Sequence, residues 1–350
     1  MLSEKSGHEF KTDLNLMIDV VRLTRELIDI PSVTGDEFQI GTSLGELLLR
    51  LGYHVELQDV SDERSNIIAT TDAAPRVVLS THMDTVPPFI ESSEDDEFIF
   101  GRGACDAKGI MAAQIAAAEE LRADGAHEIG FLFTVDEEVT SAGAKLANEH
   151  PLAASCEYLI NGEPTGNQLA IGTKGSLQAT ISTTGRAAHS AYPEAGESAI
   201  EKLLDVLDDL RRLNWPRDDV FGETTCNIGI IAGGKRANII PDAAEATVLV
   251  RLAADSSSVR NLFEDAIASR GTIDYKSVHD PVRLLTIGGF EQMVARFTTD
   301  IPYLSNWGQP MLIGPGSILV AHTDRERVNK SELLAAVEIY RKLVKRLLGE

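Results

Sequence analysis

Apolar positions along the chain recur first at helical spacing. Leu14–Ile28 carries apolar residues on one helical face and stops before Pro31, and a second helical run ends at Gly52. Further runs of the same kind cover residues 110–124, 201–213 and 330–348. These segments predict amphipathic helices, each of which needs a sheet or another helix to cover its apolar face.

Short runs rich in β-branched and aromatic residues separate these helices. In the first half of the chain they are YHVEL, NIIAT, RVVLST, IGFLFT and EYLIN. Apolar strands that alternate with helices indicate an α/β layer with a largely parallel sheet. From about Thr173 the pattern changes to α+β, with the period-two run SLQATISTTG, and it changes back from about Leu284. We therefore predict one α/β domain, 1–172 and 284–350, with a mixed, largely parallel sheet, and an inserted α+β domain, 173–283.

Charge and composition narrow the classes of partner. The 350 residues include 32 Lys and Arg against 54 Asp and Glu, a formal net charge of −22. Binding to nucleic acid or to an anionic membrane depends on clustered basic residues, so both partners are disfavoured. The N-terminal 15 residues lack an apolar segment behind a basic start, and no apolar run reaches the roughly 18 residues of a membrane span. We expect a cytoplasmic protein.

Histidine and acidic residues follow three of the predicted strands. His82 ends one, Glu137 and Glu138 follow the next, and Glu163 follows a third. Binding sites in open α/β sheets collect at the carboxyl ends of strands, so these side chains can converge. Two further candidates are Asp106, in the turn GRGACDAKG, and His322, after the turn GPG.

The donor types suggest a metal. Imidazole and carboxylate ligands suit zinc, cobalt or manganese, and the three cysteines show no spacing typical of thiolate ligands. Two histidines with several carboxylates can hold two ions if one carboxylate bridges them. Asp84 lies two residues after His82, on the same side of a strand, where it could orient the imidazole. The adjacent Glu137 and Glu138 could divide the work, one binding metal and one moving protons.

Each motif alone has an ordinary explanation. An HxD triplet occurs by chance in many chains, a Glu pair often starts a solvated helix that Thr140 or Ser141 could cap, and GEP is a common turn. A phosphate-binding loop is rejected because Gly109, not Ser or Thr, follows Lys108. The joint occurrence of these motifs, in order and at successive strand ends, favours the metal site.

A larger set of motifs resembles the M20 metallopeptidase and deacylase family. These motifs are HMDTVP, GRGACDAKG, TVDEEVTSAGA, NGEPT, GRAAHSAYPEAGESAI, GGKRANIIPDAAEATVLVR and GPGSILVAHTDRERV, and the resemblance spans about residues 15–348. It implies a catalytic domain of the di-zinc aminopeptidase type with an inserted domain that acts as a lid and dimerises the protein.

The resemblance also implies roles for individual residues. His82 and Glu163 would complete one metal site, and Glu138 and His322 the other. Asp106 would bridge two divalent ions, zinc in the first place and cobalt or manganese otherwise. Glu137 would be the general base and Asp84 the residue that orients His82.

In the inserted domain, the resemblance implies that His189 stabilises the oxyanion, often from the partner subunit of a homodimer. Asn238 and Arg251 match positions that hold the oxyanion region and the substrate carboxylate. From the residues alone, His189 could instead be a surface or packing histidine, and Arg251 a solvated strand arginine.

The resemblance implies amide hydrolysis on an N-acyl amino acid or a short peptide. The spacing of the inserted domain favours an acetylornithine deacetylase-like enzyme of arginine biosynthesis, acting on N-acetylated ornithine, citrulline or lysine. A succinyl-diaminopimelate desuccinylase is an alternative, to which Arg325 and Arg327 near His322 could contribute, and so is a dipeptidase or carboxypeptidase. A catalytically silent binding protein of the same fold is the remaining alternative.

Overall fold

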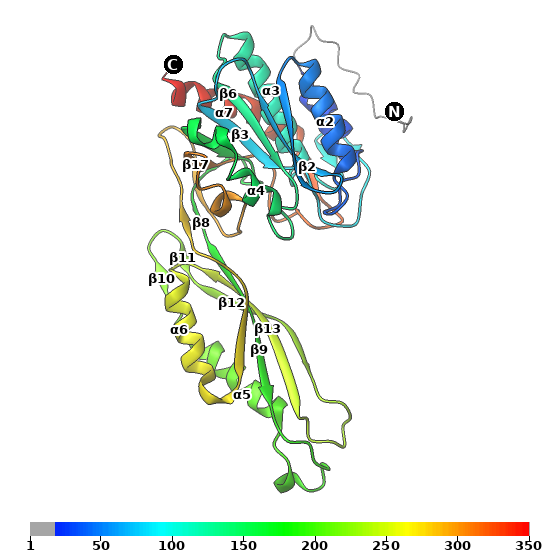
Figure 1. Cartoon of the computed structure of the whole chain (residues 1–350), viewed down its shortest axis with the longest axis vertical. Coiled ribbons are helices and arrows are strands. Elements are labelled where there is room, and N and C mark those ends of the chain that lie inside the picture. Colours follow the sequence, from blue (N-terminus) through cyan, green and yellow to red (C-terminus); the bar gives the residue numbers. More distant parts are fainter. Residues whose placement is uncertain (1–17, 350) are drawn as a thin grey trace. The chain divides into compact units, whose positions relative to one another are not determined.

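The structure is a computed structural model that describes residues 18–349 (Figure 1). It divides into two units. The larger, called the catalytic unit after the role that the resemblance implies, is made of described residues up to 171 with 284–293 and 299–349, and the inserted unit is made of 172–283 with 294–298. The last five residues lie outside the interval 173–283 predicted for the insertion. The start of the predicted helix at Leu14 and the segment considered as an export signal lie outside the described residues.

A six-stranded sheet forms the centre of the catalytic unit, in the order β1-β2-β6-β3-β7-β17. Its strands are β1 (His54–Ser61), β2 (Arg64–Thr70), β3 (Val77–His82), β6 (Ile129–Thr134), β7 (Tyr158–Asn161) and β17 (Gln309–Leu312). Strands β6, β3, β7 and β17 run parallel, whereas β2 is antiparallel to both β1 and β6. The four parallel strands therefore end at one edge.

Alternating residues of these strands fill two separate apolar layers. In β3, Val77 and Leu79 face the main core, whereas Val78 faces a smaller cluster that contains Trp307. The helices that contribute to the main core are α1 (Val20–Ile28), α2 (Phe38–Arg50), α3 (Lys108–Ala123) and α7 (Lys330–Leu348). Helix α4 (Ala142–Ala147) packs on the other face. Because both faces are covered, the central strands are apolar throughout rather than alternating.

Short strands form two further small sheets. Strands β4 (Ser93–Glu94), β5 (Phe98–Phe100) and β18 (Arg327–Asn329) form one small sheet, and β8 (Leu169–Thr173), β15 (Val282–Arg283) and β16 (Gln292–Ala295) form another. The boundaries between the units fall within or next to the second group.

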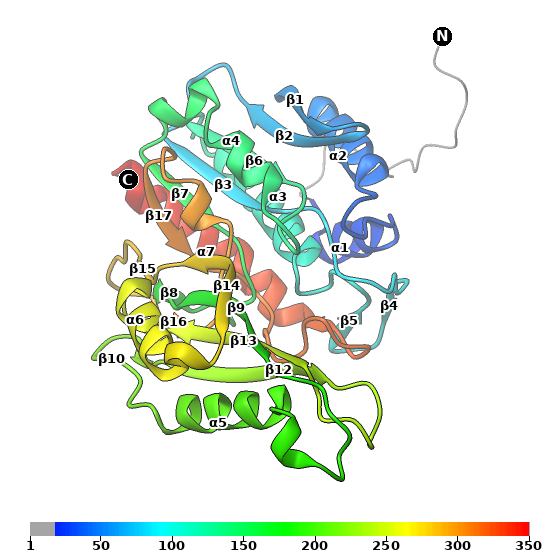
Figure 2. The ribbon, with the colours of Figure 1, turned by 60° about the horizontal axis from the view of Figure 1, so that its bottom comes forward.

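The inserted unit has its own antiparallel sheet and its own core (Figure 2). The sheet order is β12 (Thr225–Gly233), β13 (Ala243–Leu252), β9 (Gly175–Thr184) and β14 (Thr272–His279), and a hairpin pairs β10 (Arg217–Asp218) with β11 (Gly222–Glu223). Helices α5 (Ala199–Arg212) and α6 (Ser256–Ile267) supply apolar residues to this core. Ser198 and Asp255 cap their N-termini with side-chain hydrogen bonds.

These elements confirm the predicted α/β class, with a mixed, largely parallel sheet in one unit and an α+β insertion. Among residues 18–349, no helix is long and apolar enough to cross a bilayer. A role of the insertion as a lid or in dimerisation stays a prediction.

Candidate metal centre and active site

The candidate ligands lie where the parallel strands end. His82 is the last residue of β3, Glu163 follows β7 by two residues, and the Glu137–Glu138 pair follows β6. His82 pairs in register with Thr134, the last residue of β6. The parallel register therefore brings three segments that are well separated in sequence to one edge of the sheet.

A first group, called the buried trio here, consists of His82, Asp106 and Glu163. One ligand atom from each lies within 4.8 Å of the others. The His82 Nε2 is 3.0 Å from Asp106 Oδ1, and all three residues are buried. Burial disfavours the charged imidazole, yet hydrogen bonds to Asp106 and Asp84 raise the pKa of His82 well above its usual value.

A second group, the half-exposed trio, consists of Asp106, Glu138 and His322. The His322 Nε2 is 3.2 Å from Asp106 Oδ2 and 3.0 Å from Glu138 Oε1. The His322 side chain is 49% exposed, whereas the Asp106 side chain is 6% exposed. Hydrogen bonds to both carboxylates raise the pKa of His322 to about 10. Asp106 is the member common to both trios, one oxygen facing each histidine.

The two trios fit divalent metal ions. Their donors are imidazole nitrogens and carboxylate oxygens, the set that suits zinc, cobalt or manganese. The carboxylates raise the pKa values of His82 and His322, so they favour positive charge at this position. A dication supplies that charge and leaves each imidazole neutral, the form that ligates.

Asp84 lies beside His82, although its carboxylate mainly serves another segment. The His82 Nδ1 is 2.9 Å from the main-chain oxygen of Asp84 and 3.5 Å from its carboxylate. The carboxylate accepts the backbone N–H groups of Glu137 and Glu138, at 3.1 and 3.2 Å, and the hydroxyl of Thr34 at 2.8 Å. Asp84 therefore holds both the imidazole and the glutamate pair.

Glu137 has the environment of a proton carrier. Burial, followed by the charge of Glu163, raises the pKa of Glu137 well above its usual range. Burial likewise raises the pKa of Glu163, against the opposing effect of His82. A carboxyl group whose pKa is raised in this way is better suited than an ordinary carboxylate to accept a proton and return it.

The turn that presents the glutamate pair is held by ion pairs rather than by helix capping. Asp136, at φ 69°, accepts a hydrogen bond from Arg64 at 2.8 Å and another from Thr140. Arg64 also donates to both oxygens of the buried Glu37. Ser141 is the residue before α4, but its side chain makes no capping hydrogen bond. The pair is therefore not a solvated helix start.

The other three predicted residues lie in the inserted unit. His189 and Asn238 are exposed and lie on adjacent segments, since His189 bridges to Ile239 and the Ser190 N–H donates to the Asn238 carbonyl at 3.1 Å. Arg251 is on β13 and is partly buried, which lowers its pKa. The structure brings His189 and Asn238 together.

Two buried carboxylates near the site were not predicted. Asp300 accepts a hydrogen bond from Thr134 at 2.8 Å, and burial raises its pKa to about 6. Glu326 pairs with Arg102. Both lie in short irregular segments, and neither segment has a spacing that marks it in the sequence. The neighbouring Arg325 is exposed, and Arg327 lies over the Phe98 ring, 5.1 Å from its centre.

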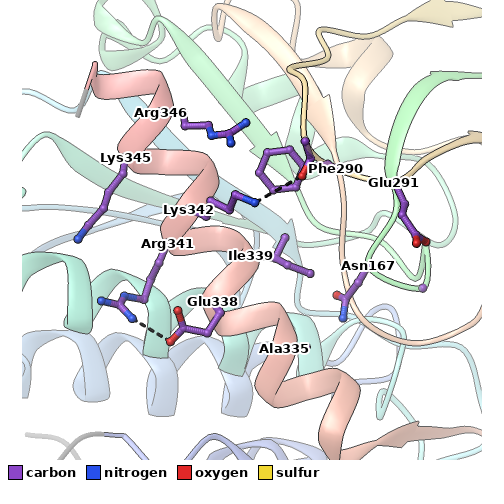
Figure 3. A pocket seen from close by; sticks show the side chains of 12 residues that line it. Asn167, Phe290, Glu291, Ala335, Glu338, Ile339, Arg341, Lys342, Lys345 and Arg346 are labelled. Atoms are coloured by element: carbon purple, nitrogen blue, oxygen red, sulfur yellow. Dashed lines mark hydrogen bonds and ion pairs between the residues drawn. The ribbon is translucent and has the colours of Figure 1, made fainter.

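A separate cavity of about 760 Å³ lies along α7 and contains none of the predicted site residues (Figure 3). Lys342 and Arg346 lie over the ring of Phe290, at 5.2 and 5.5 Å from its centre. Arg341 and Lys345 pair with Asp124, at the end of α3. These contacts thus hold α7 against Phe290 and against the end of α3.

Comparison with known proteins identifies the class. Residues 78–346 match the pattern of the Peptidase family M20/M25/M40. A peptidase M20 domain-containing protein of Schizosaccharomyces pombe is 38% identical over 93% of this chain and 84% of its own length. A probable carboxypeptidase of Aspergillus clavatus is 36% identical over 93% of this chain and 88% of its own length.

Solved structures share the fold. A tripeptidase from Staphylococcus aureus has a TM-score of 0.79 at 22% identity and covers 94% of this chain and 100% of its own. A dinuclear metal binding peptidase from Bacillus subtilis has a TM-score of 0.69 at 16% identity, covering 94% and 97%. The fold and the site thus define a metal-dependent hydrolase of amide bonds. The chain belongs to peptidase family M20/M25/M40.

Proposed function

We propose that this protein hydrolyses the amide bond between an acyl or peptidyl group and the α-amino group of an amino acid whose carboxylate is free. The observation that carries this proposal is the pair of trios that share Asp106, with the partly buried Glu137 beside them. N-acyl amino acids and carboxypeptidase substrates both contain this bond.

In this proposal the two trios hold two divalent metal ions, zinc in the first place. His82 and Glu163 complete one site, Glu138 and His322 the other, and Asp106 serves both. When bound, the ions would polarise the amide carbonyl and make the attacking water more acidic. The fold neighbour from Bacillus subtilis that is described as dinuclear supports two ions rather than one.

Glu137 acts as the general base and then as the general acid. It takes a proton from the attacking water and gives it to the leaving amine nitrogen, so that the carboxylate is regenerated. Its backbone N–H is fixed by the Asp84 carboxylate at 3.1 Å, which keeps the side chain at one position relative to the ligands.

The inserted unit supplies the remaining groups. His189 donates a hydrogen bond to the oxyanion, Asn238 supports the same region, and Arg251 binds the free carboxylate of the substrate. A guanidinium suits this task because it can bind a carboxylate through two hydrogen bonds. The partial burial of Arg251 strengthens such a contact.

We also propose a homodimer through β12 of the inserted unit. β12 is an edge strand of its sheet, and its Ile230 and Ile231 are 62% and 56% exposed. An exposed apolar edge strand favours pairing with a second copy across a two-fold axis. Light scattering should give a dimer that becomes monomeric in Ile230→Lys/Ile231→Lys.

Two narrower substrates fit the proposal. The spacing of the insertion favours an acetylornithine deacetylase-like reaction in arginine biosynthesis. The relatives with 35–38% identity that are called probable carboxypeptidases, or M20 domain proteins, favour a peptidyl group. Both substrates present the same free carboxylate.

A matched substrate panel tests the proposal. The panel contains N-acetylornithine, N-acetylcitrulline, N-succinyl-diaminopimelate, dipeptides and an N-blocked dipeptide, each beside its C-terminal amide. We expect turnover of at least one free acid and little turnover of its amide. Preference for acetylornithine selects the deacetylase and preference for the blocked dipeptide selects the carboxypeptidase. Equal turnover of acids and amides would refute recognition of the carboxylate.

A further inference from the structure

Glu326 is a buried carboxylate that contacts the loop of another candidate ligand. It lies four residues after His322, and its side chain is 1% exposed. Its Oε1 accepts the backbone N–H groups of Gly103, Cys105 and Asp106, at 2.9, 3.3 and 3.2 Å. One oxygen thus fastens the turn that ends at Asp106, the residue shared by both trios.

Arg102 fastens the same two segments from the other side. It donates to Glu326 Oε2 at 2.6 Å and to the Thr323 carbonyl at 3.1 Å, next to His322. The Gly101 N–H donates to the Glu326 carbonyl at 3.2 Å. Arg102 and Glu326 therefore tie residues 101–106 to residues 322–326.

The turn around Asp106, residues 101–107, contains no helix or strand, and several of its backbone hydrogen bonds, such as that from the Lys108 N–H to the Gly103 carbonyl at 2.8 Å, are local to it. Gly101 and Gly103 have φ values of 141° and 91°, and a Cβ on Gly103 would lie 2.8 Å from Lys108 Cδ. A charged acceptor suits several converging N–H donors better than a neutral one does. The separation between the Asp106 turn and the His322 segment thus depends on the side chain of Glu326.

The two trios depend on this contact to different degrees. His82 and Glu163 are placed by strands β3 and β7, which belong to the central sheet. His322 lies in an irregular segment at φ 62°, and this segment is joined to the Asp106 turn through Glu326 and Arg102. If the contact through Glu326 and Arg102 were weakened, Asp106 would therefore separate from His322 before it separates from His82 and Glu163.

We propose that Glu326, paired with Arg102, is a positioning residue that sets the separation between the Asp106 carboxylate and the His322 imidazole, and thereby metal affinity at the half-exposed trio. The inference rests on the metal centre proposed above. A purely structural ion pair would instead affect both trios equally.

Cobalt titration of the full chain tests this inference, followed by the visible absorption of the bound ion. In Glu326→Gln the amide can still accept the backbone N–H groups, but its NH₂ group faces the Arg102 donors. We expect affinity at one of the two sites to fall about 10- to 100-fold, with the other unchanged. Glu332→Gln is the matched control, since Glu332 accepts the Gly316 N–H at 3.0 Å.

A second substitution provides a rescue. In Arg102→Gln/Glu326→Gln the two amides can pair, so part of the lost affinity should return, and excess cobalt should restore kcat without changing KM. If Glu326→Gln does not fold, Arg102→Lys replaces it, with the same loss expected at one site. Equal losses at both sites, or affinities equal to those of Glu332→Gln, would overturn the inference. A wild-type protein that binds no cobalt would instead refute the metal centre itself.

Discussion

The catalytic unit holds its candidate residues at the buried ends of parallel strands, whereas the inserted unit presents His189 and Asn238 on exposed segments. His82 and Glu163 are 2% and 4% exposed. In the inserted unit, His189 Nδ1 accepts the Ala191 N–H at 3.2 Å, and the His189 ring lies 6.4 Å from the Tyr192 ring. The candidate metal ligands of the first unit are therefore shielded from solvent, whereas the two residues of the second unit are accessible to a substrate, as the proposed function requires.

The largest effect on kcat is expected from substitution of Glu137, and it tests the role proposed for the catalytic unit. Glu137→Gln keeps the size of the side chain but removes proton transfer, so kcat should fall about 10²- to 10⁴-fold. Metal content, measured by elemental analysis, should stay at the wild-type level. The exposed Glu149 offers a control, Glu149→Gln, with wild-type kcat. A fully active Glu137→Gln would show that another group is the base.

The inserted unit should show the next largest effect. His189→Ala removes a donor to the oxyanion, so kcat should fall about 10²- to 10³-fold with metal content unchanged. His127→Ala removes an exposed histidine of the catalytic unit and provides the comparison in the same kinetic assay. Equal rates for the two variants would make His189 a surface residue.

Substitution of Arg251 should affect substrate binding more than the chemical step. Loss of a charge-assisted hydrogen bond to the substrate carboxylate should raise KM by about 10- to 100-fold in Arg251→Ala, with a smaller change in kcat. The effect should vanish on substrates whose carboxylate is replaced by an amide. A drop in kcat alone, on both kinds of substrate, would argue against carboxylate binding.

The smallest effect concerns the pH dependence of metal-free protein. The pKa of His322 is raised to about 10 in the folded state, above its ordinary value of about 6.5. The stabilisation from its two carboxylate contacts is therefore complete below pH 6.5 and is lost as the pH rises through about 10. Urea midpoints of chelated wild type should fall over this interval by more than those of His322→Gln. If the urea midpoints of the two proteins changed in parallel with pH, the carboxylate contacts of His322 would contribute nothing to the free energy of unfolding.

The sequence pattern was sufficient to predict those site residues that lie at the ends of regular strands. The apolar runs ending at His82 and before Glu163 predicted the strands, and parallel strands necessarily end at a common edge. The fold class and the family followed from the same motifs. The helix predicted for 330–348 is α7, with the same bounds.

Other features depend on long-range contacts that spacing cannot reveal. Glu326 and Asp106 are 220 residues apart in sequence, and their contact joins two irregular segments. The Asp84 carboxylate was predicted to orient His82, and it lies 3.5 Å from the imidazole, but its hydrogen bonds to the backbone of Glu137 and Glu138 were not predicted. Such partners depend on how loops pack, and loops carry no periodicity.

Metal reconstitution tests the central claim most directly. Chelated protein would be titrated with zinc while bound metal and hydrolysis of a substrate from the panel are measured on the same samples. We expect no activity without metal, a rise in activity that ends at two bound ions per chain, and loss of both ions in Asp106→Asn. Undiminished hydrolysis by protein without detectable bound metal would contradict this claim.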